Sequence, residues 1–156
     1  MTWQGRLPQP NALQQLAITL TLRLQSGGPD HEYTGMTTDA SGFFTADVSG
    51  LPAGIYNWRV KDPKYLANAG SVTLAGDPAT DVEMGLLRAG DANDDNVCNS
   101  TDFSILRNSF GKAPGDPGYD DRADFTGDET VSINDFNVLR NNFGTGGAPP
   151  IRPGGR

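Results

Sequence analysis

Residues 91–111 read DANDDNVCNSTDFSILRNSFG, and residues 124–144 read DFTGDETVSINDFNVLRNNFG. With the second stretch placed 33 residues after the first, the two carry the same residue at nine positions. A repeat of this period predicts two copies of one supersecondary unit, packed together because neither copy can bury its apolar face alone. This pair is therefore expected to build the C-terminal third of the chain.

Each copy opens with a 12-residue loop whose oxygen-bearing residues have the spacing of an EF-hand calcium loop. Calcium takes about six to eight oxygen ligands, and alternate residues of such a loop turn toward one ion. The predicted ligands of the first loop are Asp91, Asn93, Asp95, the carbonyl of Val97, Asn99 and Asp102. Those of the second loop are Asp124, Thr126, Asp128, the carbonyl of Thr130, Ser132 and Asp135. An acidic, solvated turn is the alternative for either loop, but two full-length matches favour two calcium sites.

The two sites are not expected to bind calcium equally well. Position 6 of such a loop usually holds glycine, because the chain turns sharply there. Here position 6 holds Asn96 in the first loop and Glu129 in the second, and Asn tolerates a left-handed backbone better than Glu does. The hydroxyls of Thr126 and Ser132 are also shorter than the amides of the first loop, and would reach an ion through water. The first site is therefore predicted to be the tighter one.

A short helix is predicted after each loop, because apolar side chains recur there at helical spacing. The apolar stripes are Phe103, Leu106 and Phe110 in the first copy, and Phe136, Leu139 and Phe143 in the second. The residues expected to cap the helix starts are Ser100 or Thr101, and Asn134. We expect the two stripes to pack the helices together.

The charge of the chain excludes several classes of function. Its 156 residues include 19 acidic and 12 basic side chains, for a net charge of −7. Residues 90–144 alone hold eleven acidic and four basic residues. This balance disfavours nucleic acid as a partner, because phosphate binding requires basic residues. No apolar run approaches the ~20 residues of a membrane span, so a membrane is not expected as a partner either.

Catalysis finds little support in the sequence. Cys98 is the only cysteine, which excludes an internal disulfide framework and a multi-cysteine zinc site. We expect it to be a buried, small apolar residue. His31 is the only histidine, and no nucleophile motif accompanies it. Calcium accounts for the paired carboxylates, so this chain is not expected to be an enzyme.

The N-terminal part has the pattern of short strands. Residues 16–24, LAITLTLRL, alternate apolar and polar side chains, which predicts a half-buried strand. Further strands are expected over 31–37, 42–48, 54–61, 70–75 and 80–87. Short strands separated by Gly- and Pro-containing turns are typical of an antiparallel β-sandwich. We therefore expect two domains, divided as an N-terminal extension 1–13, a sandwich 14–89, a helical domain 90–144 and a disordered tail 145–156.

Residues 90–144 resemble a dockerin of type I, a domain with two F-hand calcium loops. Both repeats carry the resemblance, with the Asp-x-Asn-x-Asp run at 91–95 and the segment from Val97 to Asp102 after it. It implies a domain that binds two calcium ions and a cohesin, and so docks a secreted protein onto a scaffold or cell-surface protein. The residues implied to contact the cohesin are Ser100, Thr101, Arg107, Asn108, Ile133, Asn134, Arg140 and Asn141. Arg-Asn stands in both helices where many members of the family carry two adjacent basic residues.

Residues 38–44, TDASGFF, and 51–60, LPAGIYNWRV, resemble the prealbumin-like sandwiches of the carboxypeptidase-regulatory-like and collagen-adhesin B types. A sandwich directly before a dockerin is similar to the X module of cellulosomal proteins, which take part in polysaccharide catabolism. The resemblance implies an extracellular or cell-surface location, and a parent enzyme is possible upstream in a longer chain. Two alternatives stay open: a calcium-stabilised structural stalk without a cohesin partner, and a carbohydrate-binding module that uses Tyr56 and Trp58.

Overall fold

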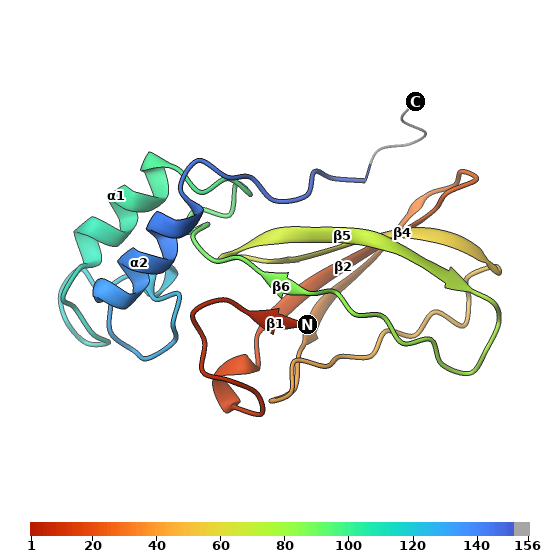
Figure 1. The fold of residues 1–156 in the computed structure, drawn as a ribbon, viewed down its shortest axis with the longest axis horizontal. Coiled ribbons are helices and arrows are strands. Elements are labelled where there is room, and N and C mark those ends of the chain that lie inside the picture. The colour runs from red at the N-terminus through yellow and green to blue at the C-terminus, as the bar shows by residue number, and fades with distance from the viewer. Residues whose placement is uncertain (152–156) are drawn as a thin grey trace.

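The computed structural model describes residues 1–151. Two short helices, α1 (Ser100–Ser109) and α2 (Ile133–Asn142), lie together at one end of the molecule, and the strands of a sheet extend away from them (Figure 1). None of the helices in the described residues is long and apolar enough to cross a membrane.

A four-stranded antiparallel sheet forms the N-terminal part. Its strands are β2 (Ala17–Leu24), β3 (Asp30–Thr37), β4 (Gly54–Asp62) and β5 (Tyr65–Leu74), in the order β3-β2-β4-β5. A separate parallel pair joins β1 (Thr2–Trp3) to β6 (Leu86–Leu87). The strands predicted over 16–24, 31–37 and 54–61 are confirmed to within one residue at each end. The strand expected over 70–75 begins earlier, at Tyr65.

The alternation in β2 explains why one face of the sheet carries the core. Ile18, Leu20 and Leu22 are buried, whereas the residues between them are partly exposed. Trp58 of β4 lies opposite Leu22 in the ladder and is buried on the same face. Because apolar area removed from water stabilises the fold in proportion to its size, this face is the main source of stability of the sheet.

One of the expected strands does not form, and another is reduced to two residues. Residues 42–48 contain no strand in the structure, and only Leu86–Leu87 of the segment 80–87 is part of one. Phe44 and Val48 still pack against the core. The alternating pattern of this segment therefore reflects burial of its apolar side chains and not pairing with another strand. Irregular chain and the short β1–β6 pair therefore cover the sheet, where a β-sandwich was predicted to have a second sheet (Figure 1).

Both helices begin one or two residues earlier than expected. Their N-caps are Asn99 and Ser132, each in a capping box with the Asp three residues later. The expected caps Ser100, Thr101 and Asn134 are therefore wrong. The residue at loop position 9 has extended backbone angles in both copies, and its side-chain oxygen accepts a hydrogen bond from the second residue of the helix.

The apolar stripes pack the helices together through part of their length. Phe103 and Phe136 meet edge to face with ring centroids 6.2 Å apart, and Leu106 and Leu139 are buried. The last aromatic residues of the stripes are exposed instead: Phe110 and Phe143.

Both ends of the described chain take part in the fold. Met1 and Trp3, which belong to the expected N-terminal extension, are buried in the core. The first residues of the expected disordered tail, 145–148, lie against the sheet: the chain after α2 turns back along β5, and Ala148 donates a 2.7 Å hydrogen bond to the carbonyl of Ala67. Residues 152–156 of that expected tail lie outside the described residues.

Candidate metal centre

Each loop bends through two residues with a left-handed backbone, at loop positions 4 and 6. In the first loop these are Asp94 (φ 61°) and Asn96 (φ 67°), and in the second Gly127 (φ 74°) and Glu129 (φ 63°). The two repeats thus fold alike despite their different residues. A left-handed conformation costs a residue with a Cβ atom about 1–2 kcal/mol, so Glu129 carries the strain expected at its position.

Three carboxylates of the second loop converge. Asp124, Asp128 and Asp135 each place one oxygen within 4.8 Å of the oxygens of the other two. Asp124 and Asp135 are buried, whereas Asp128 is exposed. Carboxylates this close repel one another, and a cation that they share removes the repulsion. The all-oxygen donor set of the second loop fits a calcium ion.

Backbone N–H groups fix the two buried carboxylates of the second loop. Asp124 accepts a 3.0 Å hydrogen bond from the backbone of Glu129. Asp135 accepts bonds of 2.9 Å from the backbones of Thr126 and Ser132. The first and last carboxylates of the loop are therefore held in place by the loop itself.

The first loop repeats this arrangement. Asp91 accepts hydrogen bonds from the backbones of Asp95 at 2.9 Å and Asn96 at 2.8 Å. Asp102 accepts a 2.8 Å bond from the backbone of Asn99. Asp91 and Asp102 are buried, and Asp95 is exposed. The carboxylates at positions 1, 5 and 12 thus have the same burial in both loops.

The other predicted ligands lie nearer the loop surface. Four are partly buried: Asn93, Asn99, Thr126 and Ser132. Two are exposed: Val97 and Thr130. The side-chain oxygens of Asn99 and Ser132 accept hydrogen bonds from their own helices, so a ligand at position 9 would serve the helix as well as an ion.

Burial shifts the acid–base properties of the loops. It raises the pKa of Asp91 and of Asp124 above the ordinary value, and the charge of Asp135 raises that of Asp124 further. A hydrogen bond from the Asn93 amide lowers the pKa of the exposed Asp95. Burial and the nearby carboxylates raise the pKa of the Cys98 thiol to about 12, so this residue is a buried, neutral thiol, as its apolar interpretation predicted.

Lys61, near the end of β4, reaches into the first loop. Its ammonium lies 2.9 Å from Oδ2 of Asp91 and 2.6 Å from Oδ1 of Asp94. It also donates a 2.5 Å hydrogen bond to the carbonyl of Asp62. The ammonium therefore lies within 2.9 Å of three oxygens, two of them in the first loop.

The other side of the same β4–β5 hairpin contacts the start of the second loop. Lys64 pairs with Asp121 at 2.7 Å, just before that loop begins. The hydroxyl of Tyr65 donates a 2.7 Å hydrogen bond to the carbonyl of Phe125. The hairpin tip therefore lies between the two loops and touches both.

Asn96 joins the first loop to the sheet and to the C-terminal segment. Its side-chain oxygen accepts a 2.8 Å hydrogen bond from the backbone of Ala67, and its side-chain nitrogen donates a 3.0 Å bond to the carbonyl of Ala148. Arg59 donates to the same carbonyl at 3.0 Å. Sequence reasoning missed these roles of Lys61, Lys64, Tyr65 and Asn96. The available signal was a pair of lysines flanking an Asp-Pro turn in an otherwise acidic chain.

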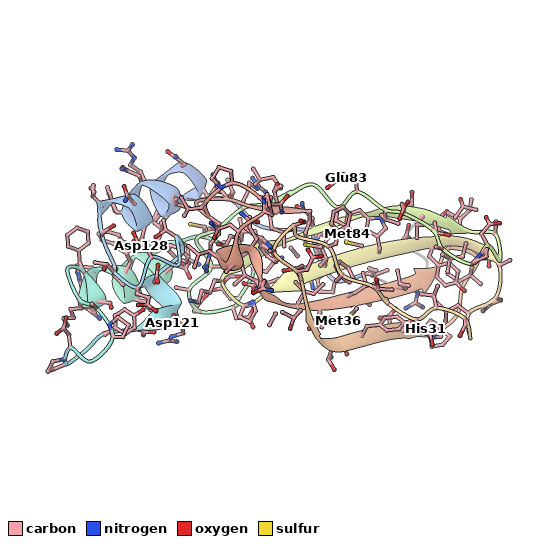
Figure 2. The ribbon with its side chains drawn as sticks, turned by 90° about the horizontal axis from the view of Figure 1, so that it is seen from below. His31, Met36, Glu83, Met84, Asp121 and Asp128 are labelled. Atoms are coloured by element: carbon pink, nitrogen blue, oxygen red, sulfur yellow. The ribbon has the colours of Figure 1, made fainter. Side chains whose placement is uncertain are left out.

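The residues implied to contact a partner are all exposed in the structure: Ser100, Thr101, Arg107, Asn108, Ile133, Asn134, Arg140 and Asn141. They occupy equivalent positions on α1 and α2, at the end of the molecule where Figure 2 shows Asp121 and Asp128. His31 lies on the sheet, well away from this end (Figure 2). The Arg140 guanidinium lies 5.9 Å from the ring centroid of Phe136, which supports the side chain over the helix surface.

The aromatic residues of β4 do not offer a surface for a sugar. Tyr56 is fully buried and Trp58 is nearly so. Both side chains lie on the core face of the sheet, since their spacing of two residues places them on the same side as the buried residues of β2. The carbohydrate-binding alternative that used this pair is therefore wrong.

Comparison with known proteins agrees with this arrangement. Residues 89–144 match the family model described as the dockerin type I domain. A comparison with curated proteins found no match. The fold as a whole is similar to chains in two crystal structures of a type II cohesin–X-dockerin complex from Acetivibrio cellulolyticus, one an N-terminal and the other a C-terminal interface mutant.

The similarity to the first of these chains extends over 93% of this chain and 92% of the other, with a TM-score of 0.66 and 21% identity. For the second, the shares are 85% and 83%, with a TM-score of 0.61 and 20% identity. At 20–21% identity this similarity shows the fold alone, over both the sheet and the helical part of this chain. Residues 89–144 of this chain thus match the dockerin type I family, and most of the chain shares the fold of chains from X-dockerin complexes.

Proposed function

We propose that this chain is a calcium-dependent docking module, in which residues 90–144 bind a cohesin. The observation that carries the proposal is the pair of equivalent loops, each followed by a helix with exposed residues at matching positions. The dockerin match over residues 89–144 supports it, as does the fold shared with chains from cohesin–X-dockerin complexes. In this proposal the chain acts by binding and not by catalysis.

Each loop would hold one calcium ion. Its ligands would be those predicted from the sequence, with the two buried carboxylates already fixed by backbone N–H groups. Calcium bound to the folded state stabilises it by RT ln(1 + [Ca]/Kd), about 4 kcal/mol at a thousandfold excess over the Kd. The ligand types favour the first loop as the tighter calcium site. The positive charge of the nearby Lys61 would lower the calcium affinity of that loop.

The exposed residues of α1 and α2 would form the surface that binds the cohesin. Ser100, Thr101, Arg107 and Asn108 form one half, and Ile133, Asn134, Arg140 and Asn141 form the other. The two halves differ chiefly in Ile133, an exposed apolar side chain opposite Ser100. A cohesin that binds through either half would therefore do so with unequal affinity.

The sheet over residues 14–89 would act as an X-module-like support for the dockerin, with residues 1–13 as part of its cover. Docking of this kind places the chain outside the cell, at a scaffold or cell-surface protein. It also implies that the chain acts as part of a larger secreted protein, such as an enzyme.

Calorimetry would test the proposal. The intact chain is titrated with calcium, and then with purified type I and type II cohesins in calcium and in EDTA. We expect two calcium sites, cohesin binding that EDTA abolishes, and a loss of at least about tenfold in affinity for the variant Arg107→Ala/Arg140→Ala. Glu83→Ala, an exposed change on the sheet part (Figure 2), serves as the control. Calcium binding without affinity for any cohesin would leave the structural stalk as the better account.

A further inference from the structure

The two loops differ in their contacts with the β4–β5 hairpin. In the first loop, the ammonium of Lys61 lies against the carboxylate at position 1, Asp91, whose side chain is fully buried. In the second loop, Lys64 contacts the carboxylate of Asp121 and the backbone carbonyl of Asp124 at 3.4 Å. One loop therefore has a lysine on a predicted metal ligand, and the other has its lysine outside the carboxylate cluster.

The environment of Lys61 makes this contact persistent. The side chain is only 12% exposed, and its ammonium donates hydrogen bonds to Asp62 and Asp94 and forms an ion pair with Asp91. Lys61 also belongs to a strand that is paired on both sides, by β2 and by β5. Its position is thus set by the sheet and not by the loop that it contacts.

An ammonium beside a carboxylate opposes the binding of a divalent cation in two ways. It competes for the same carboxylate, and its positive charge repels the ion through a part of the protein that water screens poorly. The first loop is also fastened by Asn96 to Ala67 of β5 and to Ala148 of the C-terminal segment. It therefore cannot shift away from Lys61 without breaking its hydrogen bonds to the sheet.

We propose that Lys61 is an internal counter-ion of the first loop, which competes with calcium for Asp91 and so lets the sheet domain set the calcium affinity of that loop. This inference rests on the proposed binding of calcium by the two loops. Lys61 neutralises part of the negative charge of the loop carboxylates, so the first loop keeps its shape at low calcium. It then binds calcium only at a higher calcium concentration than its ligands alone would require.

Calorimetry on the intact chain tests the proposal. Every protein in this experiment carries Asp128→Asn, which removes an exposed carboxylate and weakens calcium binding at the second site. In that background, Lys61→Met is expected to tighten calcium binding at the first loop by about tenfold or more. Lys61→Arg keeps the charge and should stay close to the parent affinity. Lys64→Met removes the same charge from the same hairpin and should leave the first loop unchanged.

Chemical labelling of the wild-type chain provides a second measurement that does not depend on a variant folding. The rate at which an acylating reagent modifies Lys61 is followed by mass spectrometry with and without calcium, with Lys64 as the internal reference. Competition for Asp91 predicts faster labelling of Lys61 when calcium is bound.

The outcomes are distinguishable. An unchanged or weaker first-loop affinity in Lys61→Met, or labelling of Lys61 that does not rise with calcium, would overturn the role of Lys61 while leaving calcium binding intact. If neither the parent chain nor any variant takes up calcium, the proposed function fails, and this inference fails with it.

Discussion

The hydroxyl of Tyr65, the first residue of β5, donates a 2.7 Å hydrogen bond to the carbonyl of Phe125 in the second loop. Both residues are fully buried, and Arg6 donates to the same hydroxyl at 3.0 Å. Burial raises the pKa of Tyr65 to about 12, so the hydroxyl stays protonated and able to donate. A residue of the sheet thus satisfies a backbone group of the loop across the junction.

Removing that hydroxyl is expected to destabilise the whole chain. Tyr65→Phe would leave the Phe125 carbonyl without a partner inside the protein, at a cost of about 1–3 kcal/mol in the free energy of unfolding, measured by urea denaturation. Tyr56→Phe is the control, because its hydroxyl bonds to the carbonyl of the exposed Pro52, which water can satisfy. Equal losses in the two variants would contradict the importance of the junction.

Glycine at position 6 of the second loop should relieve backbone strain. Glu129 has φ 63°, so Glu129→Gly is expected to raise stability by up to about 1 kcal/mol, once the greater freedom of glycine in the unfolded chain is counted. Thermal unfolding in EDTA measures this without a contribution from calcium. Glu129→Ala removes the same carboxylate and keeps the Cβ atom, and a gain as large in that variant would refute the strain argument.

The N-cap of α2 should contribute to stability in the absence of metal. Ser132→Ala removes the oxygen that accepts from Asn134 at 3.2 Å, at an expected cost of about 1 kcal/mol. Far-UV circular dichroism during urea unfolding in EDTA separates this capping role from any role in binding calcium. Ser104→Ala within α1 should cost less, because that hydroxyl bonds back to the carbonyl of Ser100. A loss of stability seen only with calcium present would assign Ser132 to the metal alone.

A buried acid beside the junction predicts a specific dependence of stability on pH. Burial raises the pKa of Asp62 from 3.8 to about 6, against the opposing effects of the Lys64 N–H and of Lys61. Between those two values the folded chain holds a proton that the unfolded chain has released. The contribution of Asp62 to stability is therefore greatest below about pH 4, and it declines as the pH rises through about 6.

Asp62→Asn should abolish that decline while it keeps the oxygen that accepts from Lys64. Relative to wild type, the variant is expected to gain on the order of 1–3 kcal/mol between pH 4.5 and pH 7. Urea unfolding at the two pH values in EDTA measures the difference, and Asp77→Asn on an exposed turn controls for the loss of a charge. A difference between variant and wild type that is the same at both pH values would show that Asp62 does not titrate as described.

Local patterns sufficed for much of the architecture. The repeat predicted two loop–helix units, and α1 and α2 follow the two loops as expected. Gly111 and Gly144 follow the two helix ends with φ of 78° and 80°, a backbone conformation that glycine adopts readily. Three strands were placed to within one residue. These features depend on residues close in sequence, whose spacing decides which side chains share a face.

Other features could be found only once the chain was folded. Lys61 lies 30 residues before Asp91 in the sequence, and no motif connects them. Residues 145–148 are held by backbone groups of the first loop and of β5, which a composition rich in Gly and Pro does not reveal. The segment 42–48 has the alternation of a strand and buries its apolar residues without a ladder, because hydrogen-bond pairing depends on a partner strand supplied from elsewhere.

The ligands of the candidate site were predictable from the sequence, whereas the charges around each loop were not. Oxygen ligands at alternate positions follow from twelve consecutive residues, so the sequence alone predicted two calcium loops and an order of affinity between them. The charge that each loop experiences depends on residues brought to it through space. A lysine of the sheet reaches the first loop, and Coulomb interactions depend on distance and burial, not on separation along the chain.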